Sequence, residues 1–176
     1  MAAASGAHAT IYEVHRSFPQ ASLAGTVEIP MGSYTIQNAS PSPFTSVNLI
    51  FTVNGTPYFL NHCLTGDIHG TGEFFINATA TSLTFSTANA NGSNPADLDF
   101  SDNTVQEANN YYAIGSDTIA GFESGWTDAG NFAVGATFPT VFAIVPEPSG
   151  FALLALGGMA LLHRRKDGIG ALMRGL

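Results

Sequence analysis

Two histidines and a cysteine lie close together in the segment NHCLTGDIHG, residues 61–70, and side chains of these types bind metal ions. His62, Cys63 and His69 supply borderline and soft ligands, and Asp67 lies between them. The spacing matches no standard zinc pattern, so the alternative is a group of hydrogen-bonded polar side chains after a strand. Cys63 is the only cysteine, which excludes an intramolecular disulfide and a cysteine-rich zinc site. We expect it to be a small buried side chain rather than a reactive thiol.

Three carboxylates at short spacing, Asp97, Asp99 and Asp102, occur in the segment NPADLDFSDN. Residues 89–103 are rich in Asn, Ser, Gly and Pro, which predicts a long surface loop. Hard oxygen ligands on a bendable loop suit calcium, although the segment lacks the terminal glutamate and the glycine of the helix-loop-helix calcium site. The three aspartates are therefore calcium candidates, and a solvated acidic loop is the alternative.

Two further sets of side chains suit polysaccharide as a ligand or substrate. Exposed aromatic rings offer an apolar face to sugars, so Trp126, Tyr111 and Tyr112 are candidates for a carbohydrate-binding surface, with core packing as the alternative. A glycoside hydrolase needs two carboxylates at a working separation. The candidates for that pair are Glu107, Glu123 and Asp128.

The basic residues are confined to the two ends of the chain. The sequence has five Lys and Arg against thirteen Asp and Glu, and none of the five lies between Ser17 and His163. A body without cations cannot neutralise phosphates or approach anionic lipid, which excludes nucleic acid as a partner and a peripheral membrane site on the body. Partners of the body are expected to be neutral or cationic.

Short alternating segments separated by Gly, Asn, Ser and Pro dominate residues 10–144. Asn54-Gly55 is flanked by apolar arms and predicts a two-residue hairpin turn within 48–60. The β-branched and aromatic residues within 72–87 predict two more strands or one long bent strand. The pattern predicts an all-β body, a single irregular β-sandwich or flattened barrel, followed by a short C-terminal hydrophobic helix. The other expected strands are 10–14, 23–29, 34–37, 111–114, 131–136 and 141–145.

The two ends of the chain carry patterns typical of export. Ala7-His8-Ala9 has the small-x-small pattern that precedes signal-peptide cleavage, so residues 1–9 are interpreted as the remnant of a secretory signal peptide whose reading frame extends upstream. Near the other end, two prolines precede an apolar run over 150–162, about 20 Å long as a helix at ~1.5 Å per residue. Basic residues follow it directly, which places the C-terminus in the cytoplasm and the body outside.

The segment Val145-Pro146-Glu147-Pro148-Ser149, then LLALGGMALL, then HRRK resembles the PEP-CTERM sorting signal of exported bacterial proteins. The match covers residues 145–166. The resemblance implies that an integral-membrane exosortase recognises the Pro-Glu-Pro element, cleaves near it and passes the body to the cell surface or the exopolysaccharide matrix.

Carried over to this chain, the resemblance assigns three roles within the tail. Pro146, Glu147 and Pro148 would be the recognition element, 151–162 the membrane segment, and Arg164, Arg165 and Lys166 the stop-transfer cluster. The additional residues 167–176 depart from the family pattern. The body resembles uncharacterised β bodies that precede such tails, and no activity is implied by that resemblance.

The sequence therefore predicts a non-enzymatic protein of the bacterial surface or extracellular matrix, with no cofactor. Its expected partners are exosortase, the inner membrane as a transient anchor, and exopolysaccharide. A carbohydrate-binding module and a secreted hydrolase are the alternatives.

Overall fold

The body of the chain is built entirely from β-strands. The computed structural model describes residues 8–38, 40–66, 68–104, 110–117 and 121–146. The strands are β1 (Ala9–Ser17), β2 (Ala21–Pro30), β3 (Gly32–Ile36), β4 (Ser46–Val53), β5 (Thr56–Leu60), β6 (His62–Leu64), β7 (Glu73–Ala78), β8 (Ser82–Ala88), β9 (Ala96–Ser101), β10 (Tyr111–Ser116), β11 (Gly121–Thr127), β12 (Gly130–Ala136) and β13 (Thr140–Ile144). The predicted all-β class is confirmed.

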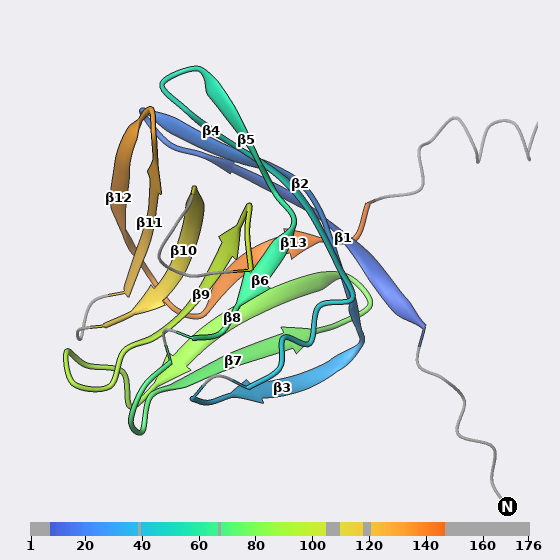
Figure 1. The fold of residues 1–176 in the computed structure, drawn as a ribbon. Helices are drawn as coiled ribbons and strands as arrows, with labels where there is room; N and C mark the ends of the chain where they lie inside the picture. Colours follow the sequence, from blue (N-terminus) through green and yellow to red (C-terminus); the bar gives the residue numbers. More distant parts are fainter. Residues whose placement is uncertain (1–7, 39, 67, 105–109, 118–120, 147–176) are drawn as a thin grey trace, which may run out of the picture. The chain divides into compact units, whose positions relative to one another are not determined.

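The strands form two antiparallel sheets. Sheet A has the order β3-β7-β8-β13-β1-β2-β4-β5, and sheet B has the order β12-β11-β10-β9-β6. Sheet A is strongly curved, and sheet B lies across its concave side (Figure 1). Strand β9 of sheet B approaches β7 in one half of sheet A and β5 in the other half. The two sheets therefore enclose one core in a sandwich-like arrangement.

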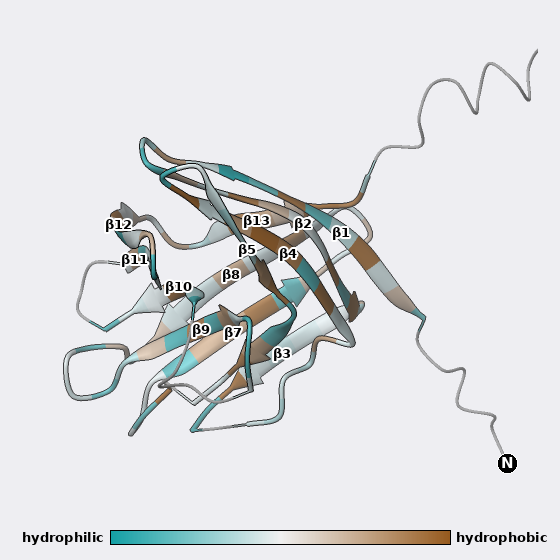
Figure 2. Ribbon diagram, turned by 45° about the horizontal axis from the view of Figure 1, so that its top comes forward, coloured by the Kyte–Doolittle hydropathy of each residue, from teal (hydrophilic) through white to brown (hydrophobic). Residues whose placement is uncertain are grey.

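The core forms because most strands alternate between buried and exposed positions. In β4, for example, Leu49, Phe51 and Val53 are buried while their neighbours Asn48 and Ile50 are exposed. Figure 2 shows hydrophobic and hydrophilic residues interspersed along the strands in this way.

Stacked phenylalanine rings connect the two sheets through the core. The ring of Phe142 on β13 stacks on Phe85 of β8 with the centroids 4.5 Å apart, and on Phe100 of β9 with the centroids 5.3 Å apart. Because β8 and β13 belong to sheet A and β9 to sheet B, these aromatic contacts join the layers.

The hairpin predicted around Asn54-Gly55 is present. Strands β4 and β5 pair in register, with Val53 opposite Thr56. Asn54 and Gly55 both have positive φ, 51° and 83°, as a two-residue turn of this kind requires. The Asn54 side-chain amide also donates to the carbonyl of Ala129, 2.9 Å away, which connects the hairpin tip to the β11–β12 turn.

The predicted long surface loop over residues 89–103 is wrong. Residues 96–101 form strand β9, which pairs with β10 on one side and β6 on the other, and all six of its residues are buried. Aspartate is disfavoured in strands, but pairing on both edges and burial against the core outweigh that local preference here. The sequence analysis also did not predict strands β6 and β11.

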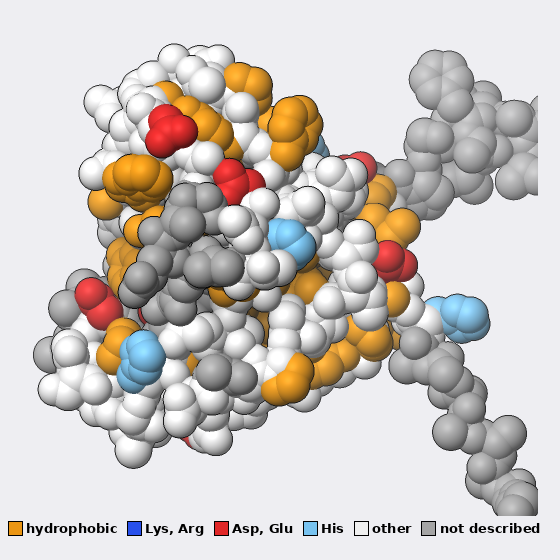
Figure 3. Space-filling view, in the orientation of Figure 1, with side chains coloured by type: hydrophobic (Ala, Val, Ile, Leu, Met, Phe, Trp, Pro, Cys, Tyr) orange, Lys and Arg blue, Asp and Glu red, His pale blue; other side chains and the backbone are white. Residues whose placement is uncertain are grey.

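The surface of the body has few charged side chains. Figure 3 shows Asp, Glu and His side chains scattered over one face, and no Lys or Arg of the described residues is visible there. This agrees with the absence of basic residues between Ser17 and His163.

The chain divides into two units at Val145. All of the strands belong to the first unit, and Pro146 is the only residue of the second unit that the structure describes. The expected hydrophobic helix, the segment Glu147–Lys166 and the extension 167–176 lie outside the described residues. Within the described ranges, no helix is long and apolar enough to cross a membrane.

One glycine of β2 gives a sharp test of this packing. Gly25 has φ +136°, and a Cβ placed on it would lie 2.2 Å from the backbone oxygen of Asn48 on the paired strand. We expect Gly25→Ala to lower the free energy of unfolding by about 2–4 kcal/mol, because it combines backbone strain with a clash that has no flexible neighbour to relieve it. Urea unfolding followed by fluorescence measures the change.

The matched control is Gly135→Ala on β12, where an added Cβ would meet no atom within 4 Å. Equal stability of the two variants would contradict the close approach of β2 and β4 at Gly25.

Candidate functional site

The outer face of sheet B, which points away from the core, carries the candidate site. The pairing of β9 to β12 sets outward side chains opposite one another in three rows across the sheet. In order from β9 to β12, the rows are Ser101, Tyr111, Trp126 and Asn131; then Asp99, Ala113, Ser124 and Ala133; and then Asp97, Gly115, Phe122 and Gly135. The residues between them, such as Phe100, Tyr112 and Phe132, belong to the core.

Small side chains hollow this face into a trough. The trough has a volume of about 670 Å³ and extends over β9, β10, β11 and β12. The middle of the trough is hollow because Ala113, Gly115 and Ser124 have small side chains. The lining residues are Asp97, Asp99, Tyr111, Ala113, Asp117, Gly121, Phe122, Ser124, Ala133, Val134 and Gly135.

Two of the three predicted aromatic residues, Tyr111 and Trp126, lie on the outer face of sheet B. Tyr111 lines the trough, and Trp126 lies directly opposite Tyr111 on the neighbouring strand and is 42% exposed. Side chains paired in this way on one face are in contact range. Tyr112 is wrongly assigned to this surface, because the alternation of β10 turns it into the core, where it is fully buried.

The carboxylates predicted to bind calcium are placed differently from expectation. Asp97 and Asp99 lie on strand β9 rather than on a loop, and both line the trough although they are only 8% and 4% exposed. Each has an interaction partner within the chain. Asp102 lies beyond the strand, where its carboxylate accepts a 2.8 Å hydrogen bond from the side-chain amide of Asn110. Among the described residues, no three His, Cys, Asp or Glu side chains are grouped so that they could hold a metal ion.

The third carboxylate of the trough, Asp117, was missed by the sequence analysis, as were Ser124 and Phe122 of β11. The alternation of Phe122, Ser124 and Trp126 with Glu123 is a period-two signal that could have identified this strand. Asp117 gave no such signal, because it becomes part of the trough only through the pairing of β10 with its neighbours.

The potential metal or thiol site at residues 62–69 is divided between a strand and a turn. His62 and Cys63 belong to β6, His69 follows in the connection to β7, and Asp67 lies outside the described residues. Burial raises the pKa of the Cys63 thiol to about 12, which keeps it protonated and unreactive at neutral pH.

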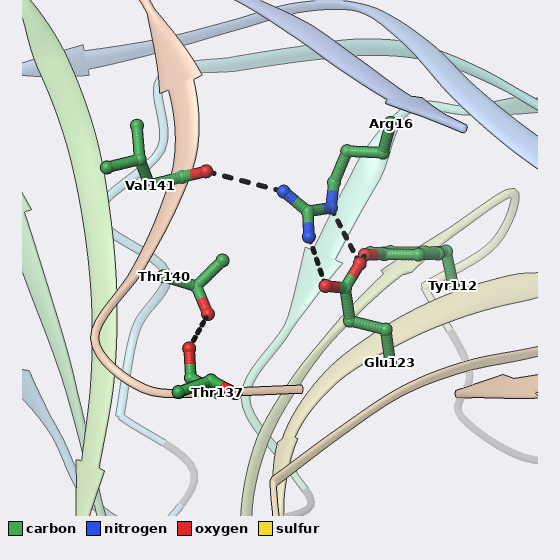
Figure 4. Close-up of polar contacts among 6 residues, drawn as sticks. All are labelled: Arg16, Tyr112, Glu123, Thr137, Thr140 and Val141. Carbon is green, nitrogen blue, oxygen red and sulfur yellow. Dashed lines mark hydrogen bonds and ion pairs between the residues drawn. The ribbon is translucent and has the colours of Figure 1, made fainter. Parts of the chain in front are cut away.

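The candidate hydrolase carboxylates do not share an open cleft in the part of the chain that is described. Glu123 points into the core, where Arg16 and Tyr112 bind its carboxylate (Figure 4). Asp128 lies in the β11–β12 turn, and Glu107 lies outside the described residues.

The contact between the buried Glu123 and the half-buried Arg16 is an ion pair that joins the two sheets. Arg16 projects from β1 of sheet A, and its Nε donates a 2.6 Å hydrogen bond to Glu123 Oε2 while Nη2 pairs with Oε1. Arg16 Nη1 also donates to the carbonyl of Val141 at 3.3 Å. Burial acts to lower the pKa of Arg16, but the bonds to Glu123 outweigh it and raise that pKa. Burial and then the adjacent Glu123 raise the pKa of Tyr112 well above its usual value.

The predicted processing residues lie mostly beyond the described part of the chain. Ala9 is the first residue of β1 and pairs with Pro30, whereas Ala7 is not among the described residues. Pro146 follows the last strand. Glu147, Pro148 and the basic cluster Arg164, Arg165 and Lys166 are also outside the described ranges.

Comparison of the chain with protein-family models, curated proteins and solved structures finds no match.

Because of the ion pair between Arg16 and Glu123, loss of Arg16 alone should strongly lower the free energy of unfolding, and removing both charges should lower it less. Replacing Arg16 with Met leaves the Glu123 carboxylate buried without its cation, so we expect Arg16→Met to lower the free energy of unfolding by about 3–5 kcal/mol. The double variant Arg16→Met/Glu123→Gln, which removes both charges, should be more stable than the single variant. Chemical unfolding of the three proteins measures the difference.

The control is His15→Met, the next residue of β1, whose side chain is 70% exposed on the other face of the strand. An Arg16→Met loss no larger than the His15→Met loss would show that the ion pair does not hold the sheets together.

The raised pKa of the half-buried Cys63 thiol predicts slow chemical labelling. At pH 8 we expect iodoacetamide to modify Cys63 at least about a hundredfold more slowly in the folded protein than in urea, since a pKa near 12 leaves almost no thiolate. Mass spectrometry of timed samples gives both rates. Comparable rates in the two states would identify Cys63 as an accessible, reactive thiol.

Proposed function

We propose that this chain is an exported bacterial protein of the cell surface or extracellular matrix that has no enzymatic role and is sorted through its C-terminal segment. The observation that carries the proposal is the order of three elements within residues 145–166. A Pro-Glu-Pro element comes first, an apolar run follows, and Arg164, Arg165 and Lys166 end the segment. Exosortase is the proposed processing partner, and the inner membrane holds the chain before cleavage.

The end of the body is compatible with cleavage at this place. Strand β13 ends at Ile144, and the last backbone hydrogen bond among the described residues runs from the Val145 amide to the carbonyl of Thr81, 3.0 Å away. The Pro-Glu-Pro element begins at the next residue. A cut near Pro148 would therefore release the body with every strand intact.

The charge distribution supports the same proposal. The only Lys or Arg of the body, Arg16, is committed to an internal ion pair, and the other four lie in the C-terminal 13 residues. The body consequently has no basic surface that would hold it to anionic lipid or nucleic acid after release.

A second candidate function is carbohydrate binding by the body, and one observation favours it. Tyr111, which lines the trough, is paired across β10 and β11 with the exposed Trp126 on the outer face of sheet B, and aromatic rings on such a face can stack on a sugar. A protein exported with a polysaccharide matrix would use such a surface to remain in that matrix. A secreted hydrolase is less well supported, since Glu123 is committed to Arg16.

Sorting is tested by the mass of the protein in cells with and without exosortase. We expect a species ending within residues 146–149 in the medium or on the surface only when exosortase is present, because cleavage separates the body from its membrane segment. Intact-mass spectrometry of membrane and secreted fractions identifies the C-terminus.

The double variant Pro146→Ala/Pro148→Ala should remain uncleaved, whereas Pro41→Ala, which replaces an exposed proline in the β3–β4 connection, should be processed normally. If the full chain through Leu176 remained in the membrane regardless of exosortase, the segment would be a plain anchor and the sorting proposal would be wrong.

A further inference from the structure

Two asparagines of this chain precede a glycine, and the fold places the two pairs in different surroundings. The pairs are Asn54-Gly55 and Asn91-Gly92, and both asparagines are exposed. An asparagine can close a succinimide ring on the main chain when its side-chain carbonyl carbon meets the next backbone nitrogen. A glycine at that next position has no Cβ to crowd the approach. Which pair can react therefore depends on how each asparagine side chain is held.

The Asn54 side chain is held away from its own main chain. Asn54 and Gly55 form the tip of the β4–β5 hairpin with φ of 51° and 83°, and the paired strands begin directly on both sides of them. The Asn54 side-chain nitrogen donates a 2.9 Å hydrogen bond to the carbonyl of Ala129 in the β11–β12 turn. Ring closure at Asn54 would have to break this bond and distort the hairpin, so the fold protects this pair.

The Asn91 side chain is instead folded over the turn that follows it. Asn91 and Asn94 exchange backbone hydrogen bonds of 3.0 and 2.7 Å, so Gly92 and Ser93 form the tip of a small turn between β8 and β9. Asn91 Oδ1 accepts a 3.0 Å hydrogen bond from the Ser93 amide. A side chain bonded to the amide two residues ahead curves back over the intervening peptide, which brings its carbonyl carbon toward the Gly92 nitrogen.

The polar contacts of this turn leave the reacting nitrogen free and support the charge that develops. The Gly92 amide donates no hydrogen bond among the described residues. Asn91 Oδ1 has a second donor, Asn94 Nδ2 at 3.2 Å, and donors on a carbonyl oxygen stabilise its negative charge when a nucleophile adds to the carbon. In the part of the chain that is described, the leaving Nδ2 has only a long 3.4 Å contact with the carbonyl of Asn89.

We propose that Asn91 is a site of spontaneous modification, at which the side chain loses ammonia and becomes aspartate or isoaspartate. The Gly92 nitrogen gives its proton to solvent and bonds to Asn91 Cγ. The Cγ–Nδ2 bond breaks, and Nδ2 takes up a proton and leaves as ammonia, so that a succinimide remains. Water then opens the ring. Opening at Cγ gives aspartate, and opening at the backbone carbonyl carbon routes the main chain through the side chain as isoaspartate. Water is the only co-reactant.

The modification changes the charge and the connections of this turn. Either product adds one negative charge to the body. Aspartate keeps an oxygen for Ser93 and Asn94, whereas isoaspartate lengthens the main chain before Gly92 and disrupts the pairing of position 91 with Asn94. Asn94 Oδ1 also accepts a 2.9 Å hydrogen bond from the Thr71 amide, so the disturbance extends to the β6–β7 connection. This inference is independent of the sorting and of the carbohydrate binding proposed above.

The two Asn-Gly pairs can be compared in one experiment. The full chain is incubated at mildly alkaline pH, where the attacking amide loses its proton more readily. Samples are digested with pepsin, and the peptides that contain Asn54 and Asn91 are followed by mass spectrometry, since each conversion adds one mass unit. In the folded protein we expect Asn91 to convert at least about tenfold faster than Asn54, because only Asn91 is held near its attacking nitrogen. In guanidinium chloride the two rates should be similar.

Two variants assign the reaction to this turn. Gly92→Ala should slow the conversion of Asn91 by about tenfold or more, because the added Cβ crowds the attacking nitrogen. Gly92 does not have a positive φ, and that Cβ would lie 3.7 Å from its nearest neighbour, the backbone oxygen of Asp117, so the fold has room for it. Gly135→Ala, where a Cβ also meets no close atom, is the control and should leave the rate unchanged. Asn91→Gln, whose longer side chain closes a less favourable ring, should abolish the change.

The products and the rates decide the proposal. Chromatographic separation of aspartate and isoaspartate forms of the Asn91 peptide, which have the same mass, would establish the succinimide route. Aspartate alone would indicate direct hydrolysis and overturn that route. If Asn91 stayed unchanged in the folded protein while converting in guanidinium chloride, or if Asn54 converted as fast as Asn91 in the folded protein, the turn would not promote the reaction and the proposal would be wrong.

Discussion

The packing of the two sheets depends on the buried carboxylate of Glu123 and on Arg16, the only Lys or Arg of the body. Glu123 is 3% exposed on the inner face of sheet B, and Arg16 reaches it from sheet A. An unpaired charge in this position would be strongly unfavourable, so the two sheets must approach each other with β1 and β11 in this relation. Tyr112 completes the arrangement by donating its hydroxyl hydrogen to the same carboxylate. The stacked phenylalanines supply apolar burial between the sheets, and the ion pair adds a directional contact between β1 and β11.

The composition of the outer face follows from that constraint. Side chains alternate along a strand, so placing Glu123 inside sets Phe122, Ser124 and Trp126 outside. A slip of one residue in β11 would expose Glu123 to solvent and move Trp126 into the core. The pairing with β10 then places Tyr111 beside Trp126 and small residues beside Ser124. The hollow of the trough and the pairing of Tyr111 with Trp126 are therefore consequences of the same register that places Glu123 beside Arg16.

The functional proposals divide the chain at the end of β13. The C-terminal segment has a basic cluster and an apolar run suited to a membrane and a membrane enzyme, whereas the body has an uncharged or acidic surface suited to a hydrated polysaccharide. The body's one arginine, Arg16, is committed to the ion pair with Glu123. On these proposals, the C-terminal segment determines where the protein is delivered. The trough on sheet B would then bind the polysaccharide that retains the protein there.

The sequence by itself determined the features that depend on neighbouring residues. The Asn54-Gly55 hairpin, the alternating strands and the all-β class follow from turn chemistry and period-two patterning, which act over a few residues. The order of elements within 145–166 is likewise a linear signal, and the expectation of sorting needed no fold.

Only the tertiary structure decided the features that depend on pairing between distant strands. Strand β9 contains two aspartates in a segment of loop-like composition, and it forms because β10 and β6 pair with both of its edges. The choice between Tyr111 and Tyr112 as the outward aromatic residue, and the burial of Glu123 against Arg16 over 107 positions of the chain, are also settled by register. Local composition cannot specify these outcomes, because the free energy that favours them comes from contacts between segments that are far apart in the sequence.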